Sequence, residues 1–302
     1  MTWYKGNIHT HTTESDGDEE PIKVTKWYKD HGYDFLVLTD HNHRTMLNYQ
    51  EDNSSLDIPL MIPGEEVTVQ LEGGDIPVHI NGIGIERVVE PIDASDVVST
   101  IQANVDAIRQ AGGIASINHP NYKWAINHHH MIQVSGATLI EIFNGSPSTN
   151  NYGSKTKPST EEIWDKILSS GKIIFGAATD DSHHYHDFHR SKANPGRGWI
   201  CVQANSLTQE DIMNSLRKGN FYSSTGVELD NLKITESSIE INICEEGTSE
   251  FTTVFTGTDG RKLFDTDSFS PVYKIPNSEK YVRATIYSSS GAKAWAQPIF
   301  IG

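Results

Sequence analysis

Short apolar runs rich in β-branched residues alternate with amphipathic segments through the first two thirds of the chain. Runs of this length, bounded by Gly, Asn and Pro, are typical of buried strands. The expected strands are 35–40 (FLVLTD), 60–66, 78–85, 113–120, 138–145, 172–181 and 198–204, and the helices between them are 21–31, 94–111 and 159–170. This alternation predicts an α/β protein built from parallel βα units, either a barrel or a layered sheet.

The pattern changes near residue 226. Residues 206–218 predict a last helix, with Ser206 or Thr208 as its N-terminal cap. After it come short strands of alternating polarity separated by Gly, Asn and Ser turns. We therefore expect a first domain at 1–226 and a small antiparallel, sandwich-like β domain at 227–302.

Charge and cysteine content narrow the function classes. The 302 residues carry a formal net charge of −16, which disfavours general attraction to nucleic acid or to an anionic membrane surface. The sequence has no apolar run near the length of a membrane span, and its start, MTWYKGN, lacks the order of a signal peptide. The two cysteines, Cys201 and Cys244, are far apart and form no CxxC motif. These features favour a reduced, cytoplasmic setting, and they give no oligomeric state.

Histidines and carboxylates stand at the ends of most of the expected strands. His9 and His11, in GNIHTHTTESDG, are two residues apart after the first strand, so their side chains point the same way and can hold one metal ion together. One such histidine would be an ordinary core or surface residue, but so many acids and imidazoles at strand ends favour a cation. The full set is His9, His11, Asp16, Asp40, His41, Glu66, His79, His119, Asp180, Asp181 and His183.

The motifs NIHTH, LTDHN, PGEEVT, VHINGIG, INHP and TDDSH resemble, in order and spacing, those of the PHP (polymerase and histidinol phosphatase) superfamily of metal-dependent phosphoesterases. The resemblance covers residues 3 to about 225. The segment RGWICVQA to FYSSTG, followed by strands, is similar to the branch that also contains an ester and carbamate hydrolase. The resemblance implies a distorted (β/α)7 barrel with a trinuclear site at its mouth.

The resemblance also implies a ligand set for three divalent ions, which can be zinc, manganese or iron. Glu66 would bridge two of the ions, because the family pattern Gly-x-Glu selects it over Glu65, and the DxH pattern selects Asp181 over Asp180. Asp40 would orient a ligand histidine or ligate directly. The implied groups are His9, His11 and Asp181 for the first ion, Glu66, His79 and His119 for the second, and Asp16, His41 and His183 for the third.

Such a site predicts hydrolysis by a hydroxide that bridges two metal ions, since close cations lower the pKa of a shared water. The expected catalytic residues are Glu66, Asp181 and Arg197. Arg197 is one of three candidates, with Arg44 and Arg190, for a cation that binds phosphoryl oxygens. A general acid could come from His43, His184, His186 or His189, and the residues do not select among them.

Other polar residues fit less specific roles. The run His128 to His130 is expected in a loop with Tyr122 and Trp124 near the mouth, where it shapes substrate binding rather than ligating, because adjacent side chains diverge. Asn144 is expected to contact substrate, and Glu141 to be structural. The sequence contains no dinucleotide-binding, P-loop or GxSxG motif.

Three functions remain open at this point. The leading hypothesis is a metal-dependent hydrolase of a small anionic phosphate ester, either a monoester or a diester. The second is hydrolysis of a carboxylic ester, carbamate or amide at the same site. The third is a non-catalytic module that docks a partner.

Overall fold

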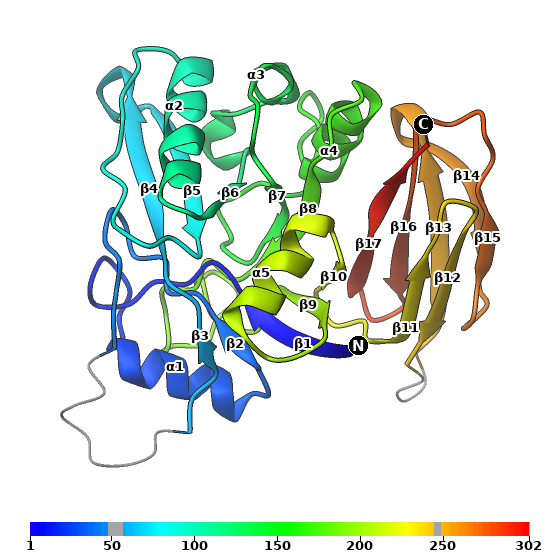
Figure 1. Cartoon of the computed structure of the whole chain (residues 1–302), viewed down its shortest axis with the longest axis horizontal. Coiled ribbons are helices and arrows are strands. Elements are labelled where there is room, and N and C mark those ends of the chain that lie inside the picture. Colours follow the sequence, from blue (N-terminus) through cyan, green and yellow to red (C-terminus); the bar gives the residue numbers. More distant parts are fainter. Residues whose placement is uncertain (48–56, 245–248, 302) are drawn as a thin grey trace.

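The computed structural model describes residues 1–47, 57–244 and 249–301 (Figure 1). The helices are α1 (Pro21–Asp30), α2 (Val97–Gln110), α3 (His128–Gln133), α4 (Thr160–Ser169) and α5 (Gln209–Lys218). The first ten strands are β1 (Thr2–Asn7), β2 (Phe35–Leu36), β3 (Leu60–Met61), β4 (Gly64–Leu71), β5 (Ile76–Ile83), β6 (Ile114–Ile117), β7 (Leu139–Asn144), β8 (Phe175–Thr179), β9 (Trp199–Ala204) and β10 (Phe221–Ser224). The others are β11 (Leu229–Ile234), β12 (Ser238–Ile243), β13 (Phe251–Gly257), β14 (Arg261–Thr266), β15 (Val272–Lys274), β16 (Tyr281–Ser288) and β17 (Lys293–Phe300).

Four helices form where the sequence predicted them, and local signals fix their ends. Pro21 opens α1, and the side chain of Asp96 caps α2 by accepting from the backbone N–H of Ser99. Ser159 and Glu162 form a capping box on α4. Thr208 caps α5, which ends at Gly219 in the left-handed region. These caps satisfy backbone groups that the helices themselves leave unpaired.

Two sheets frame the candidate site. The first has the order β4-β5-β6-β7-β8, in which β6, β7 and β8 run parallel while β4 pairs antiparallel with β5, and β5 with β6. The second contains β9-β1-β2-β3, with β1 parallel to β2 and antiparallel to β9. The expected series of parallel βα units is therefore only partly present. Only a short turn joins β4 to β5, so these strands can pair only as a hairpin.

The sheets formed by the described strands are open, so a closed (β/α)7 barrel is not confirmed and the fold class is mixed α/β. Among the described residues, backbone pairing between the two sheets is limited to two isolated bridges, Thr10 with Ser182 and His41 with Glu66. The reason lies in β1 and β2, which leave the ladder after Asn7 and Leu36. The segments that follow these strands do not continue the ladder, and they carry His9, His11 and His41 into the candidate site.

The C-terminal strands continue the sheet that contains β1. β17 pairs antiparallel with β10, and β16 and β13 follow it outward, while β11, β12 and β15 form a separate three-stranded sheet (Figure 1). The side-chain amide of Gln297 on β17 bonds to both the N–H and the C=O of Gly176 on β8. Hydrogen bonds therefore join residues on the two sides of position 226. The division into two domains at that position stays a prediction.

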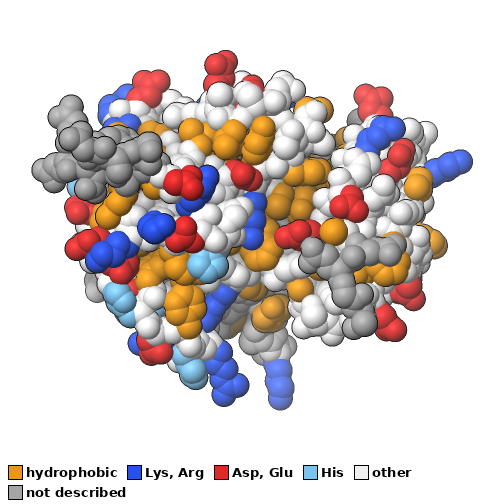
Figure 2. All heavy atoms as spheres, turned by 90° about the horizontal axis from the view of Figure 1, so that it is seen from below, with side chains coloured by type: hydrophobic (Ala, Val, Ile, Leu, Met, Phe, Trp, Pro, Cys, Tyr) orange, Lys and Arg blue, Asp and Glu red, His pale blue; other side chains and the backbone are white. Residues whose placement is uncertain are grey.

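One face of the molecule, seen from below in Figure 2, mixes apolar side chains with acidic, basic and histidine side chains, so charge of a single sign does not cover it. Within the described residues, none of the helices is both long enough and apolar enough to cross a membrane.

Candidate metal centre

Nine side chains that the sequence analysis selected converge at one end of the two sheets. They come from the ends of β1, β2, β6 and β8, from β4 and β5, and from the loop after β1. They form four overlapping groups whose donor atoms lie within 4.8 Å of one another: His11, Asp16, His41 and His183; His9, Glu66 and His119; His9, His11 and Asp181; His41, Glu66 and His79. The nine residues are brought together, while their role as ligands stays a prediction.

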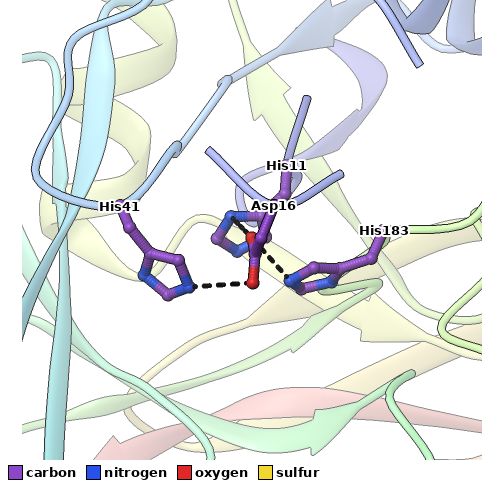
Figure 3. A group of neighbouring side chains, drawn as sticks. All are labelled: His11, Asp16, His41 and His183. Carbon is purple, nitrogen blue, oxygen red and sulfur yellow. Dashed lines mark ion pairs between the residues drawn. The ribbon is translucent and has the colours of Figure 1, made fainter. Parts of the chain in front are cut away.

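Asp16 stands between three imidazoles in the outermost group (Figure 3). Its Oδ1 lies 3.2 Å from Nε2 of His183 and 3.5 Å from Nδ1 of His11, and its Oδ2 lies 3.6 Å from Nε2 of His41. The sequence analysis assigned Asp16, His41 and His183 to one ion. The structure adds His11 to that group, and His11 is also part of the group with His9 and Asp181.

Glu66 lies at the centre of the cluster, with only 1% of its surface exposed. Its neighbour Glu65 points away, and its Oε1 accepts from the backbone N–H of Val89. Glu66, and not Glu65, is thus part of the cluster, while its role as a bridging ligand stays a prediction. Oε1 of Glu66 faces His9 Nε2 at 3.4 Å, His79 Nδ1 at 3.2 Å and His119 Nε2 at 3.4 Å, while Oε2 faces His11 Nε2 at 3.4 Å and His41 Nδ1 at 2.9 Å.

Two residues of the cluster have a backbone conformation that is uncommon for side chains with a Cβ. The φ angles of His119 and Asp181 are 21° and 49°. The backbone N–H of His119 donates to Glu141, and that of Asp181 donates to the carbonyl of His9. These bonds hold a strained backbone at the point where both side chains enter the cluster, as is common at functional sites.

The chemistry of the cluster fits a divalent cation. His9 Nε2, His11 Nε2 and His79 Nδ1 are buried atoms without a hydrogen-bond partner among the described residues, and each faces carboxylate oxygens at 3.2–3.4 Å. Buried polar atoms are rarely left in this way, because each loses its hydration. Imidazole and carboxylate are the donors that zinc, manganese and iron accept.

The electrostatics of the cluster keep its acids ionised. Burial raises the pKa of Glu66 and of Asp181, but the surrounding histidines outweigh it and lower both pKa values well below the ordinary range. Burial lowers the pKa of His41 and His183, yet Glu66 and Asp16 raise the first to about 10, and Asp16 and Asp181 raise the second to about 8. Burial, followed by the charge of His183, lowers the pKa of His11 to about 4.

Glu141 contributes more to the site than the structural role that was expected. It is 1% exposed, and its Oε1 lies 2.6 Å from His9 Nδ1 and accepts from Thr179 Oγ1, while its Oε2 accepts from the N–H of His119 and from Asn144 Nδ2. The amide of Asn144 also donates to Asp181 Oδ2 at 3.1 Å, so it contacts a cluster residue. In the sequence, the signal for this role is the position of Glu141, an acid inside the otherwise apolar strand IEIF.

Asn118, which the sequence analysis did not select, donates to Glu66 Oε1 at 2.8 Å.

Asp40 does not contact a histidine of the cluster through a hydrogen bond. It accepts from Thr12, Ser15 and Thr45, and therefore holds the loop that carries His11 and Asp16.

Asp180, which the DxH pattern did not select, lies outside the four groups and has a hydrogen-bonding role. It accepts from Tyr28 Oη and from the backbone N–H groups of Gly196, Arg197 and Gly198.

A cavity of about 460 Å³ opens over the cluster. Besides cluster residues, its lining comprises Tyr122, Ser146, Pro147, Ser148, Thr149, His184, Ser191 and Ala193. Neither Arg197 nor the alternatives Arg44 and Arg190 are among its lining residues, and Trp124 is not either. The run His128–His130 lies on α3 instead of in a loop, and none of its three side chains belongs to the four candidate groups.

Comparison with solved structures shows that the fold is similar to that of a protein described as PHP-like. A two-domain protein from Bacteroides vulgatus, described as containing a predicted PHP-like metal-dependent phosphoesterase, matches over 95% of this chain and 90% of its own, with 16% identity and a TM-score of 0.53. An amidohydrolase from Chromobacterium violaceum with bound sulfate and no metal matches over 60% of this chain and 88% of its own, with 17% identity and a TM-score of 0.43. The first of these matches confirms the resemblance found in the sequence motifs at the level of the overall fold, without the closed barrel.

No protein-family model matches the chain. No curated protein matches it either.

Proposed function

We propose that this protein is a metal-dependent hydrolase of a small phosphate ester, either a monoester or a diester. The observation that supports the proposal is the convergence of six histidines and three carboxylates, six of these nine residues buried, on one centre below an open cavity. A cluster of this kind, with several imidazole nitrogens unpaired, is costly to bury unless it holds cations.

Each group of side chains has a defined task in the proposal. His9, His11 and Asp181 would hold one divalent ion, His79 and His119 a second, and Asp16, His41 and His183 a third. Glu66 would lie between the ions, because its two oxygens face histidines of different groups. When bound, divalent cations supply Lewis acidity, which lowers the pKa of water and polarises the ester.

The ionised state of the acids supports this assignment. Asp181 and Glu66 keep depressed pKa values and therefore accept hydrogen bonds or ligate at neutral pH without first losing a proton. Glu141 orients His9 so that Nε2, and not Nδ1, faces the centre. The protein thus presents ligands in fixed orientations, which favours tight binding of the cations.

Hydrolysis of a carboxylic ester, carbamate or amide is a second candidate, and the cavity wall is compatible with it. The wall beyond the cluster offers hydroxyl groups from Ser146, Ser148, Thr149 and Ser191 and no lysine or arginine among its lining residues. Such a wall accepts a neutral substrate as well as an anionic one, because hydroxyl groups both donate and accept hydrogen bonds.

Activity assays distinguish these functions. Purified protein with added manganese or zinc would be tested on p-nitrophenyl phosphate, bis-p-nitrophenyl phosphate and p-nitrophenyl acetate. The proposal expects phosphoester turnover that Glu66→Gln abolishes, while Glu65→Gln, which changes the adjacent buried acid outside the cluster, retains it. Turnover of the acetate alone would favour the second candidate. Bound metal with no turnover of any ester would favour a docking module instead.

A further inference from the structure

Arg197 lies between β8 and β9, and its guanidinium group joins two separate segments of the chain. One terminal nitrogen donates to the carbonyl of Gly145 at 3.0 Å. The other donates to the carbonyl of His189 at 2.7 Å and to Oδ1 of Asn194 at 2.9 Å. None of these partners belongs to the metal cluster, and the side chain of Arg197 does not line the cavity.

The two segments that Arg197 joins form walls of the cavity. The segment after Gly145 contributes the lining residues Ser146 to Thr149, and the segment around His189 contributes His184, Ser191 and Ala193. Each wall has hydrogen bonds of its own, such as Ser146 N–H to Asn144 Oδ1 in the first. Among the described residues, Arg197 is the one whose side chain makes hydrogen bonds to both walls.

The surroundings of Arg197 show a close and specific fit. A Cβ added to Gly145 would lie 2.7 Å from the carbonyl oxygen of Asp180 and 3.0 Å from Cβ of Arg197, so a larger residue does not fit there. The backbone N–H of Arg197 donates to Asp180 Oδ1 at 2.6 Å, which fixes the start of its side chain. This main-chain bond does not depend on the side chain and survives substitution.

Only a guanidinium group suits this arrangement. Its planar fork presents several N–H donors in fixed directions and can reach acceptors on both sides at once, whereas a lysine ammonium is a compact charge on a flexible stem. Burial lowers the pKa of Arg197, and two backbone carbonyls and the amide oxygen of Asn194, instead of a carboxylate, accept from its terminal nitrogens. A cation used in this way has few donors left for a substrate.

We infer that Arg197 is a positioning residue that fixes the distance between the two cavity walls and thereby the affinity for substrate. This inference rests on the proposed function for its effect on turnover, and it gives Arg197 a role different from direct contact with phosphoryl oxygens. The charge of an anionic substrate is then met by the cations of the cluster.

The test compares Arg197→Met, which keeps the apolar stem and removes every donor, with Arg197→Lys, which keeps the charge. Arg217→Met is the matched control, because Arg217 on α5 also donates to a backbone carbonyl, that of Gly112. Hydrogen exchange would be measured without substrate for peptides that cover 145–153 and 184–194. We expect exchange about tenfold faster in both peptides for Arg197→Met, as loss of the tie favours local opening. The lysine variant should lie in between, and the control should match the wild type.

Kinetics and metal content complete the test. For Arg197→Met, KM for bis-p-nitrophenyl phosphate or p-nitrophenyl acetate should rise about tenfold with kcat within about twofold, since uniform binding is lost. Metal content should not change. Unchanged exchange in both walls, or a fall in kcat confined to phosphate substrates, would overturn the inference, as would faster exchange throughout the chain, including β16. If the wild type hydrolyses no ester, the proposed function fails, but the exchange result still decides whether Arg197 ties the walls.

Discussion

Oε1 of Glu141 lies 2.6 Å from Nδ1 of His9, and both side chains are buried. Since an ionised carboxylate only accepts, Nδ1 donates the proton of this bond, and Nε2 of His9 faces Glu66 and Asp181. The same carboxylate holds the backbone of His119 and, through Asn144, the side chain of Asp181. Glu141 therefore sets the orientation of three cluster residues from outside the cluster.

Replacement of Glu141 by Gln should weaken metal binding without preventing folding. The amide keeps the volume but cannot accept at both of its atoms, so His9 loses its fixed tautomer and the affinity should fall about 10- to 100-fold. Competition with a chelating dye measures this change. Glu210→Gln, on α5, is the control and should bind as the wild type does. An unchanged affinity in Glu141→Gln would show that His9 is oriented in another way.

Metal binding at pH 7 should release protons. Glu66 and Asp16 raise the pKa of His41 to about 10, and Asp16 and Asp181 raise that of His183 to about 8, so both imidazoles carry protons at pH 7 in chelator-treated protein. A metal ion must displace those protons. Between pH 7 and 9 His183 loses its proton, so the number released should fall as the pH rises. Titration calorimetry in buffers of different ionisation enthalpy counts the protons, and a release that grows with pH would contradict the assignment.

Removal of one member of a buried ion pair should destabilise the protein strongly. Asp165 on α4 accepts from Nε and a terminal nitrogen of Arg283 on β16, both at 2.7 Å, and Arg283 is 2% exposed. Asp165→Ala leaves that guanidinium without its main partner, at a cost of about 3–5 kcal/mol in the free energy of unfolding. Urea denaturation measures the loss. Asp265→Ala removes an exposed partner of Lys262 and should change stability by less than about 1 kcal/mol.

A chain cut after residue 226 should not fold stably. The cut removes β17, the partner of β10, together with Gln297, which bonds to both backbone groups of Gly176. It also exposes apolar side chains that now pack against the C-terminal strands. Circular dichroism and thermal unfolding of the fragment 1–226 test this directly. A cooperative transition like that of the full chain would instead mark 1–226 as an independent domain.

More of the candidate site than of the fold could be predicted from the sequence. His9 and His11 could be paired because strand side chains alternate, and the ends of strands gather at one edge. Whether neighbouring strands pair parallel or antiparallel was harder to predict from the sequence. The run at 78–85 looks like any buried strand, and only its short connection to the preceding strand makes it antiparallel. Nothing in residues 35–40 shows that the ladder ends at Leu36.

Roles that depend on a partner distant in sequence were also hidden. Glu141 and His9 are 132 residues apart, so their contact follows from the fold and not from a local pattern. Arg197 could be selected as a cation near the mouth, but its acceptors are carbonyl groups, which every residue has. Asp40 adjoins His41, yet neighbours on an extended segment point to opposite sides, and its partners belong to the loop after β1.

The number of metal ions bound to the purified protein decides whether the cluster is a metal centre. Wild type, Glu66→Gln and Glu65→Gln would be dialysed against manganese or zinc, and the bound ions counted by elemental analysis. We expect at least two ions per chain in the wild type and in Glu65→Gln, and clearly fewer in Glu66→Gln. A folded wild-type protein that binds less than one ion per chain, or equal binding in Glu66→Gln, would contradict it.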